Sequence, residues 1–232
     1  MKKIGIVVFG AAIIVGVVIA NFFSFGKMTG NLFNFSFHSG IKGSGHAASE
    51  PRDASGFKQV EVGGVFQVEI TAQKDFSVQV DADDNLLQYI KTEVDGDVLK
   101  IEYEKDINSK TPIRVRISAP DIERIESSGA SKITMADLKN SLLDLDSSGA
   151  SRISVAGETA RLNAQVSGAS NIDADNLKAA DADVDASGAS RAYVNVTGKL
   201  KADASGASHV IYSGNPSNVE KDSSGASSIK QK

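Results

Sequence analysis

The sequence predicts an all-β protein, a parallel β-helix (β-solenoid) with coils of about 19 residues. Three observations lead to this fold class. The motif SGAS recurs at a nearly constant interval, the residues on both sides of it alternate between apolar and polar, and aromatic residues make up only 6% of the chain. A core with so few aromatic residues has to be built from small side chains, which favours thin, stacked layers.

The motif sets the period. Its first serine lies at Ser128, Ser148, Ser167, Ser187, Ser205 and Ser224, so successive copies are 20, 19, 20, 18 and 19 residues apart. A constant period of this length indicates a repeat architecture. Leucine-rich repeats require leucines at fixed spacings, calcium-binding nonapeptide coils require GGxGxD, and a propeller blade requires about 40 residues. The chain has none of these signatures.

The residues on both sides of each motif alternate with period two, as in a half-buried strand. Before the first serine, apolar residues lie at Ile125, Leu145, Ala164, Val184 and Ala202 (three positions) and at Leu143, Leu162, Ala182, Leu200 and Val219 (five positions). After it, the alternation continues with Ile133, Ile153, Ile172, Ala192, Val210 and Ile229. We therefore expect two short strands in each copy, with turn-like segments such as ADLKN and GNPSN closing the coil.

Such a unit cannot bury its apolar face alone, but copies stacked about 4.8 Å apart bury it against one another. The sequence thus predicts a regular solenoid over residues 128–230 in which SGAS forms the corner between two strands. Glycines such as Gly149 would supply a backbone conformation or close approach that a Cβ forbids. The stacked serines are expected to hydrogen-bond to one another and to the backbone of the corner.

Residues 56–127 are predicted to form an irregular β part that caps the first coil, because an unpaired strand edge needs cover. Within it, NLLQYIKTEV suggests a short helix, and Asp95-Gly96 suggests a hairpin turn. Gly63-Gly64 lies 19 residues after Ser44-Gly45, which hints that the period of the solenoid begins earlier and is interrupted by an insertion. At the far end, Lys230 and Lys232 are expected to discourage a further strand.

At the N-terminus, Lys2 and Lys3 precede seventeen residues without a charge, Ile4 to Ala20. This pattern predicts a hydrophobic helix over residues 1–23 that is either a membrane anchor or a cleaved signal peptide, with a buried helix as a third alternative. Because the two lysines favour the cytoplasm, the rest of the chain should be exported. It would face the periplasm or the cell exterior if anchored, and be secreted into the periplasm if cleaved. Residues 24–55 are predicted to be a flexible linker.

The order of the segments RDASGFKQVEVGGVFQVEI, DDNLLQYIKTEVDGDVLKIEY and RVRISAPDIERIESSGAS, followed by serial SGAS coils, resembles the head GIN domain of putative autotransporter adhesins. The resemblance covers about residues 43 to 230. It implies a right-handed, single-stranded parallel β-helix, an exported location and no established enzyme activity. This chain has SGAS where the family commonly has SGSG, a difference that concerns the geometry of the corner more than the fold.

Composition and motifs argue against several classes of function. The absence of cysteine excludes disulfides and cysteine-based zinc sites, and a net charge of −4 gives no reason to expect a nucleic-acid partner. The SGAS serines lie in no GxSxG motif and have no accompanying base, and His38, His46 and His209 are scattered. We therefore assign no catalytic, cofactor-binding or metal-binding residue and expect no enzyme.

Two columns of polar residues are nevertheless expected on the surface. Acidic and amide side chains recur at Asp146, Gln165, Asp185, Asp203 and Asp222, with Asp181 and Asp183 beside them, and this column either attracts Ca²⁺ or is simply solvated. Basic side chains recur at Lys132, Arg152, Arg191 and His209, and we expect them to pair with the acids.

The leading functional hypothesis is an exported, non-catalytic binding or adhesion module of the bacterial cell envelope. Its expected partners are the membrane, through the N-terminal helix, and a glycan or another envelope component. Two alternatives stay open. One is a structural scaffold that self-associates through its coil ends, and the other is a polysaccharide-acting β-helix enzyme.

Overall fold

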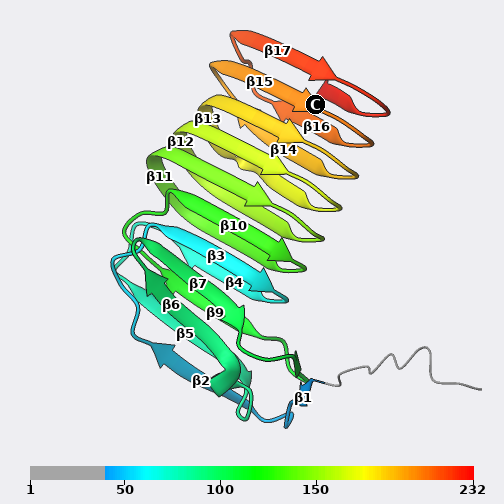
Figure 1. Ribbon diagram of the computed structural model, residues 1–232. Helices are drawn as coiled ribbons and strands as arrows, with labels where there is room; N and C mark the ends of the chain where they lie inside the picture. Colours follow the sequence, from blue (N-terminus) through cyan, green and yellow to red (C-terminus); the bar gives the residue numbers. More distant parts are fainter. Residues whose placement is uncertain (1–39) are drawn as a thin grey trace, which may run out of the picture. The chain divides into compact units, whose positions relative to one another are not determined.

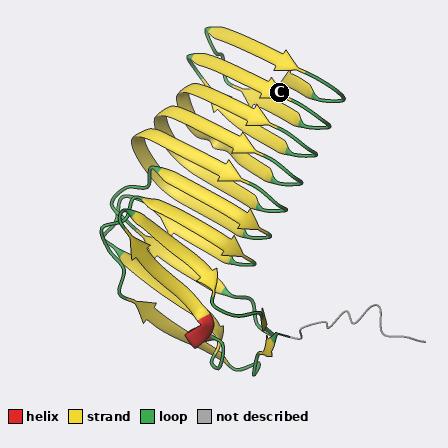
Figure 2. Ribbon diagram, in the orientation of Figure 1, coloured by secondary structure: helices red, strands yellow, loops and turns green. Residues whose placement is uncertain are grey.

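The computed structural model describes residues 40–232, and this part of the chain forms a stack of β coils (Figures 1 and 2). The predicted N-terminal helix, residues 1–23, lies outside the described residues. Within residues 40–232 the sole helical element is one 3₁₀ turn, Leu87–Tyr89, and no helix there is long and apolar enough to cross a membrane. The all-β solenoid prediction is confirmed.

The regular part of the stack runs from the middle of the chain to its end. Its strands are β10 (Arg124–Gly129), β11 (Lys132–Ser147), β12 (Arg152–Val166), β13 (Asn171–Ala186), β14 (Arg191–Val196), β15 (Lys199–Ala204), β16 (His209–Ser213), β17 (Asn218–Ser223) and β18 (Ser228–Gln231). All of them pair in parallel with the strand one coil away. The register places Leu143 on Leu162, Leu162 on Ala182 and Ala182 on Leu200, as the periodicity predicts.

The coils have two corners, but the second corner differs from the expected turn. Strands β11, β12 and β13 run through it without interruption, so the turn-like segments keep their pairing with the neighbouring coil. Lys139, for example, pairs with Glu158, and Glu158 with Lys178. Register shifts after Met135 and Ser154 absorb the bend. Further along, the corner is a true break, which separates β14 from β15 and β16 from β17.

In the cap, the order in which the strands stack differs from their order in the sequence. Strands β3 (Gln59–Gly64) and β4 (Gln67–Thr71) form a first coil on which β10 and the start of β11 lie directly, with Gly64 paired to Gly129. Beneath them lie β7 (Val98–Tyr103) and β9 (Arg114–Ser118), again in parallel. The prediction from Gly63-Gly64 is thus confirmed: the regular stacking of coils begins at β3. Residues 72–123 are the insertion that interrupts it. Ser44-Gly45, however, belongs to no coil of this kind.

Antiparallel strands close the lower edge of the stack. Strand β6 (Ile90–Asp95) forms the predicted hairpin with β7, and β5 (Ser77–Asp83) pairs with β9. NLLQYIKTEV gives only the 3₁₀ turn before β6 begins at Ile90, so the predicted helix is much shorter than its segment. From Ile90 onward, the backbone pairs with β7, beginning at Tyr103, and so does not form the hydrogen bonds of a helix.

The predicted linker is too long at its C-terminal end. Strand β2 (Ala47–Arg52) pairs antiparallel with β5, and β1 (Ile41–Lys42) pairs with β8 (Ile107–Asn108). The physical reason is that β5 would otherwise expose an unpaired edge. The buried carboxylate of Asp83 fixes the junction, because it accepts hydrogen bonds from the N–H groups of Gly45 (3.0 Å) and Lys110 (2.7 Å) and from the Ser109 hydroxyl (2.9 Å).

The core changes along the stack. In the cap it contains Phe57, Phe66 and Leu86, whereas the regular coils bury Ala, Val, Leu and Ile in aligned columns. At the last coil, Lys221 occupies the inward position that Ala202 holds one coil below. Its ammonium lies 4.5 Å from the centre of the Tyr212 ring and donates to the Tyr212 hydroxyl (2.8 Å). A charged side chain therefore covers the end of the core.

Candidate functional site

SGAS forms the first corner of each regular coil, and its glycine is required there. All six motif glycines have positive φ, from 70° to 99°. A Cβ on Gly168 would lie 2.6 Å from the carbonyl oxygen of Gly149 in the coil below. The neighbouring Ala169 donates its N–H to that same oxygen at 2.8 Å. The corners are therefore held together by a continuous column of backbone hydrogen bonds that leaves no room for a side chain.

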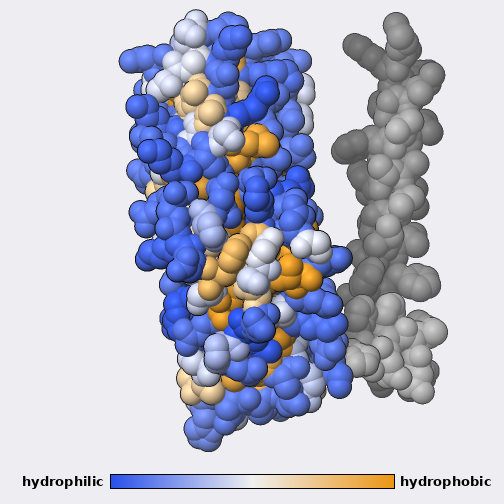
Figure 3. Space-filling model, turned by 90° about the vertical axis from the view of Figure 1, so that its left-hand side faces the viewer, coloured by the Kyte–Doolittle hydropathy of each residue, from blue (hydrophilic) through white to orange (hydrophobic). Residues whose placement is uncertain are grey.

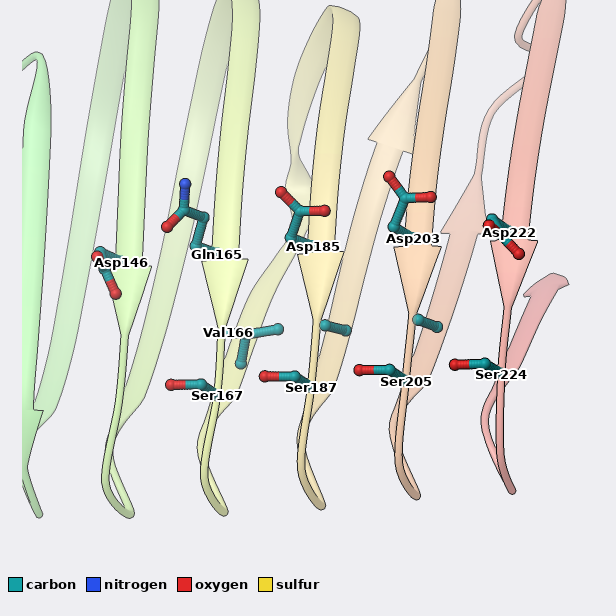
Figure 4. A pocket seen from close by; sticks show the side chains of 12 residues that line it. Asp146, Gln165, Val166, Ser167, Asp185, Ser187, Asp203, Ser205, Asp222 and Ser224 are labelled. Atoms are coloured by element: carbon teal, nitrogen blue, oxygen red, sulfur yellow. The ribbon is translucent and has the colours of Figure 1, made fainter.

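The two serines of the motif have different environments. The second is buried in every copy except the last: the Ser170 hydroxyl, for example, lies 2.8 Å from the Ser147 carbonyl oxygen and 2.5 Å from that of Ser167. Ser190 and Ser208 likewise donate to carbonyl oxygens of the coil below (3.2 and 3.0 Å). The first serine faces outward, as Ser167 does in Figure 4. The predicted hydrogen bonds from the serines to the corner backbone are confirmed, and they are structural.

The acidic column lies beside the outward serines on the strands that lead into the corner. Register pairs Asp146 with Gln165, Gln165 with Asp185, Asp185 with Asp203 and Asp203 with Asp222, and Figure 4 shows these side chains in one row. Together with the serines they line a shallow groove of about 560 Å³. The column predicted from the sequence is therefore real. Asp183 lies in the adjacent column, and Asp181 instead accepts the N–H of Lys199 (2.8 Å).

Burial, and after it the crowding of like charges, raises pKa values in this column. Burial raises the pKa of Asp185, and the charges of Asp183 and Asp203 raise it further. Burial, followed by the charge of Glu126, raises the pKa of Asp146. Two cations compensate part of this charge. Arg124 lies 3.7 Å from Asp146, and Lys201 lies 3.2 Å from Asp203 and 3.8 Å from Asp183.

Carboxylates stacked one coil apart do not converge on one point. Among residues 40–232, no group of three or more acidic, histidine or cysteine side chains is placed to hold a metal ion. His46 lies just before β2 and His209 lies in β16, where its Nδ1 is 2.8 Å from the Ser228 hydroxyl; His38 lies outside the described residues. The hypothesis of a calcium site on the acidic column gains no geometric support.

The basic column lies on the other side of the corner, on the strands that leave it. Lys132 pairs in register with Arg152, Arg152 with Asn171, Asn171 with Arg191 and Arg191 with His209. The expected pairing with acids is wrong, because none of the ion pairs formed by the described residues includes Lys132, Arg152, Arg191 or His209.

Sequence reasoning missed part of this column. Gln67 of β4 lies directly below Lys132, and Arg114 of β9 lies below Gln67. The Nε of Arg114 donates to the Oε1 of Gln67 at 3.2 Å. The inserted cap separates Arg114 from the repeats, so no constant spacing marks it in the sequence.

Two other hollows lie on the side of the stack formed by the second corners. One, of about 730 Å³, is lined by Gln73, Lys74, Asp75, Phe76, Ser77, Ser118 and Pro120, and the other, of about 280 Å³, lies around Lys139, Glu158 and Lys178. Figure 3 views this side and shows patches of hydrophobic residues within a mainly hydrophilic surface. Neither hollow brings together the residues that the sequence singled out.

The repeat, the corner and the cap agree with a known family. The family model described as "Putative auto-transporter adhesin, head GIN domain" matches residues 56–216, more than half of the chain. The chain belongs to this family. Sequence comparison with curated proteins gives no match.

Solved structures agree with the fold of this head GIN domain. A putative adhesin from Bacteroides fragilis superposes with a TM-score of 0.69 at 20% identity, covering 83% of this chain and 100% of that one. Putative adhesins from Parabacteroides merdae (TM-score 0.55, 17% identity, 83% and 98% covered) and Parabacteroides distasonis (0.52, 20%, 83% and 99%) are also similar. At these identities the similarity concerns the fold.

Proposed function

We propose that this chain is an exported, non-catalytic binding module of the cell envelope that adheres to a glycan or another envelope polymer. The observation that carries the proposal is the alignment of surface side chains into straight columns by parallel pairing from one coil to the next. Backbone hydrogen bonds at each corner make this surface rigid. A rigid surface that repeats every 4.8 Å or so suits a partner that is itself a repeating polymer.

A self-stacking scaffold is the second candidate, and the coil ends argue against it. At the lower end the outermost strands β2 and β6 are antiparallel to their neighbours and so do not continue the parallel coil, and Lys221 places a charge at an inward position of the last coil. Inward-pointing charges are a recognised means of preventing edge-to-edge association.

Export belongs to the same proposal. It rests on the predicted helix over residues 1–23, as either anchor or cleaved signal, and on the adhesin-type family. We also retain the right-handed sense of the coils, which the family resemblance implies. A reporter fused after Lys232 should be active outside the cytoplasm, and should lose that activity when residues 1–23 are deleted. A reporter active only in the cytoplasm would contradict export.

The binding proposal is tested with residues 40–232, which form a compact unit with a core of their own. This fragment is screened against an array of neutral and charged glycans and against polymers extracted from cell envelopes. We expect saturable binding to at least one of them and no change in the glycan. Cleavage of an array glycan would favour the enzyme alternative. Failure to bind any of these probes would refute the proposal.

A further inference from the structure

We propose that the basic column beside the SGAS corner binds a linear polyanion, an envelope polymer that carries phosphodiester or uronate groups. We define this basic strip as Arg114, Gln67, Lys132, Arg152, Asn171, Arg191 and His209, in order up the stack. The inference rests on the proposed function and deepens it by naming the chemical class of the ligand.

The strip keeps like charges next to each other. Lys132 and Arg152 are direct neighbours in register on adjacent strands. A pair of like charges directly opposite each other destabilises a sheet. The repeat offers neutral alternatives at this position, since Asn171 and Ser228 occupy it in other coils. The charges are therefore not a requirement of the fold.

The cations of the strip form no ion pair with the described residues. Some basic side chains elsewhere do: Arg116 lies 2.7 Å from Asp81, and Lys201 lies 3.2 Å from Asp203. Glu69 and Asp173 lie in the column next to the strip, yet neither forms an ion pair with it. Asp81 lies opposite Arg114 in register, but its carboxylate pairs with Arg116. Lys132, Arg152 and Arg191 are exposed, so their charges are available to a ligand.

The geometry suits an extended chain. Neighbouring coils are about 4.8 Å apart. Two coils, or about 10 Å, separate Arg114 from Lys132 and also Arg152 from Arg191. The whole strip, from Arg114 to His209, is about 29 Å long. The corner beside it exposes glycine and alanine, such as Gly168 and Ala169, which carry no charge and little bulk. A polymer can therefore lie along the strip without a steric barrier, with anionic groups meeting successive cations.

A second copy of this chain is the competing occupant, because the acidic column has the same spacing. The contacts of that column favour the polyanion. Arg124 and Lys201 already lie against Asp146, Asp183 and Asp203, so part of its charge is neutralised within the molecule. The cations of the basic strip form no such ion pairs, so their charges stay available to an anionic ligand.

The test measures binding of residues 40–232 to three defined polymers: polygalacturonate as the uronate probe, polyphosphate as the phosphodiester-like probe, and neutral dextran. We expect binding to at least one polyanion, none to dextran, and a marked loss of affinity between 50 and 200 mM salt, since exposed charges are screened within about 8 to 10 Å. Comparison of the two polyanions distinguishes carboxylate from phosphate as the source.

The double variant Arg152→Gln/Arg191→Gln should weaken polyanion binding about tenfold. Its matched control is Arg161→Gln/Lys178→Gln, which removes the same charge from exposed residues at the second corner and should bind as the parent does. Circular dichroism and thermal unfolding confirm that both variants fold. Equal losses in the two variants would show a general charge effect and overturn the inference.

Sedimentation of the parent addresses the competing occupant. Association that both Arg152→Gln/Arg191→Gln and Asp185→Asn/Asp203→Asn abolish would assign the strip to a second copy and overturn the inference. Binding to neutral glycans without polyanion binding would also overturn it and leave the proposed function standing. No binding in either the array or this assay would refute both.

Discussion

The substitution Gly168→Ala tests whether close approach of the backbones, and not backbone conformation alone, fixes glycine in the SGAS corner. Gly168 has φ +70°, and an added Cβ would lie 2.6 Å from the Gly149 oxygen and 3.2 Å from the Gly149 nitrogen. Gly96 is the matched control. Its φ is +64°, nearly the same, but no atom lies within 4 Å of the position of its Cβ.

The difference between the two variants isolates the effect of the contact. Left-handed backbone conformation costs a non-glycine residue about 1–2 kcal/mol, and this applies to both sites. At Gly168 alone, the coils must separate to admit the methyl group. Overpacking of this kind costs about 1–3 kcal/mol, and stretching the hydrogen bond from Ala169 to Gly149 costs about 0.5–1.5 kcal/mol. We expect Gly168→Ala to lose about 2.5–6.5 kcal/mol and Gly96→Ala about 1–2 kcal/mol.

The free energy of unfolding is measured by urea titration at 25 °C on residues 40–232, with fluorescence and circular dichroism recorded together. Both signals are needed because repeat proteins can unfold in more than one step. An unchanged m-value shows that a shift of the midpoint reports stability. If Gly168→Ala costs no more than Gly96→Ala, the close-packed corner is not what fixes the glycine.

Three further predictions follow from the same contacts. Ser170→Ala should cost about 1 kcal/mol because a buried hydrogen bond is lost, whereas the outward Ser167→Ala should be neutral in the same titration. Burial raises the pKa of Asp83, but hydrogen bonds from the residues of the cap outweigh it and lower the pKa below 3.8. The ionised carboxylate therefore contributes to the free energy of unfolding above pH 3.8, and this contribution is lost as the pH falls below that value. The free energy of unfolding of the parent should thus fall more steeply with decreasing pH than that of Asp83→Asn. Equal pH dependence in the two proteins would contradict this. Lys221→Val should associate in a concentration-dependent way in sedimentation, because it removes the charge that prevents another strand from pairing with the last coil. A variant that stays monomeric at high concentration would contradict this role of Lys221.

The repeat was the part of the fold that the sequence predicted best. Each SGAS copy that lies between two coils has the same environment, so position within the period determines burial, register and backbone conformation there. Leu143, Leu162 and Ala182 illustrate this, since equal spacing from the motif places them on top of one another. The acidic and basic columns follow from the same argument.

The cap could not be predicted in this way, because its contacts join segments far apart in sequence. Residues 47–52 pair with β5, and Asp83 joins Gly45 to Lys110. Neither contact repeats, so no periodicity reveals it. The second corner departs from the prediction for another reason. There, pairing with the coils above and below overrides the preference of turn-forming residues, as at Gly157, which pairs with Leu138 and Leu177.

The most direct test of this account is a residue-resolved footprint of polygalacturonate or polyphosphate, whichever binds, on residues 40–232, from amide chemical shifts at low salt. The account predicts that the largest changes lie along one side of the corner, at Lys132, Arg152, Asn171 and Arg191 and at the adjoining Gly-Ala residues. The acidic column from Asp146 to Asp222 should remain unchanged. Changes centred on the acidic column or on the second corners, or scattered over the stack, would contradict a ligand that lies along the basic strip.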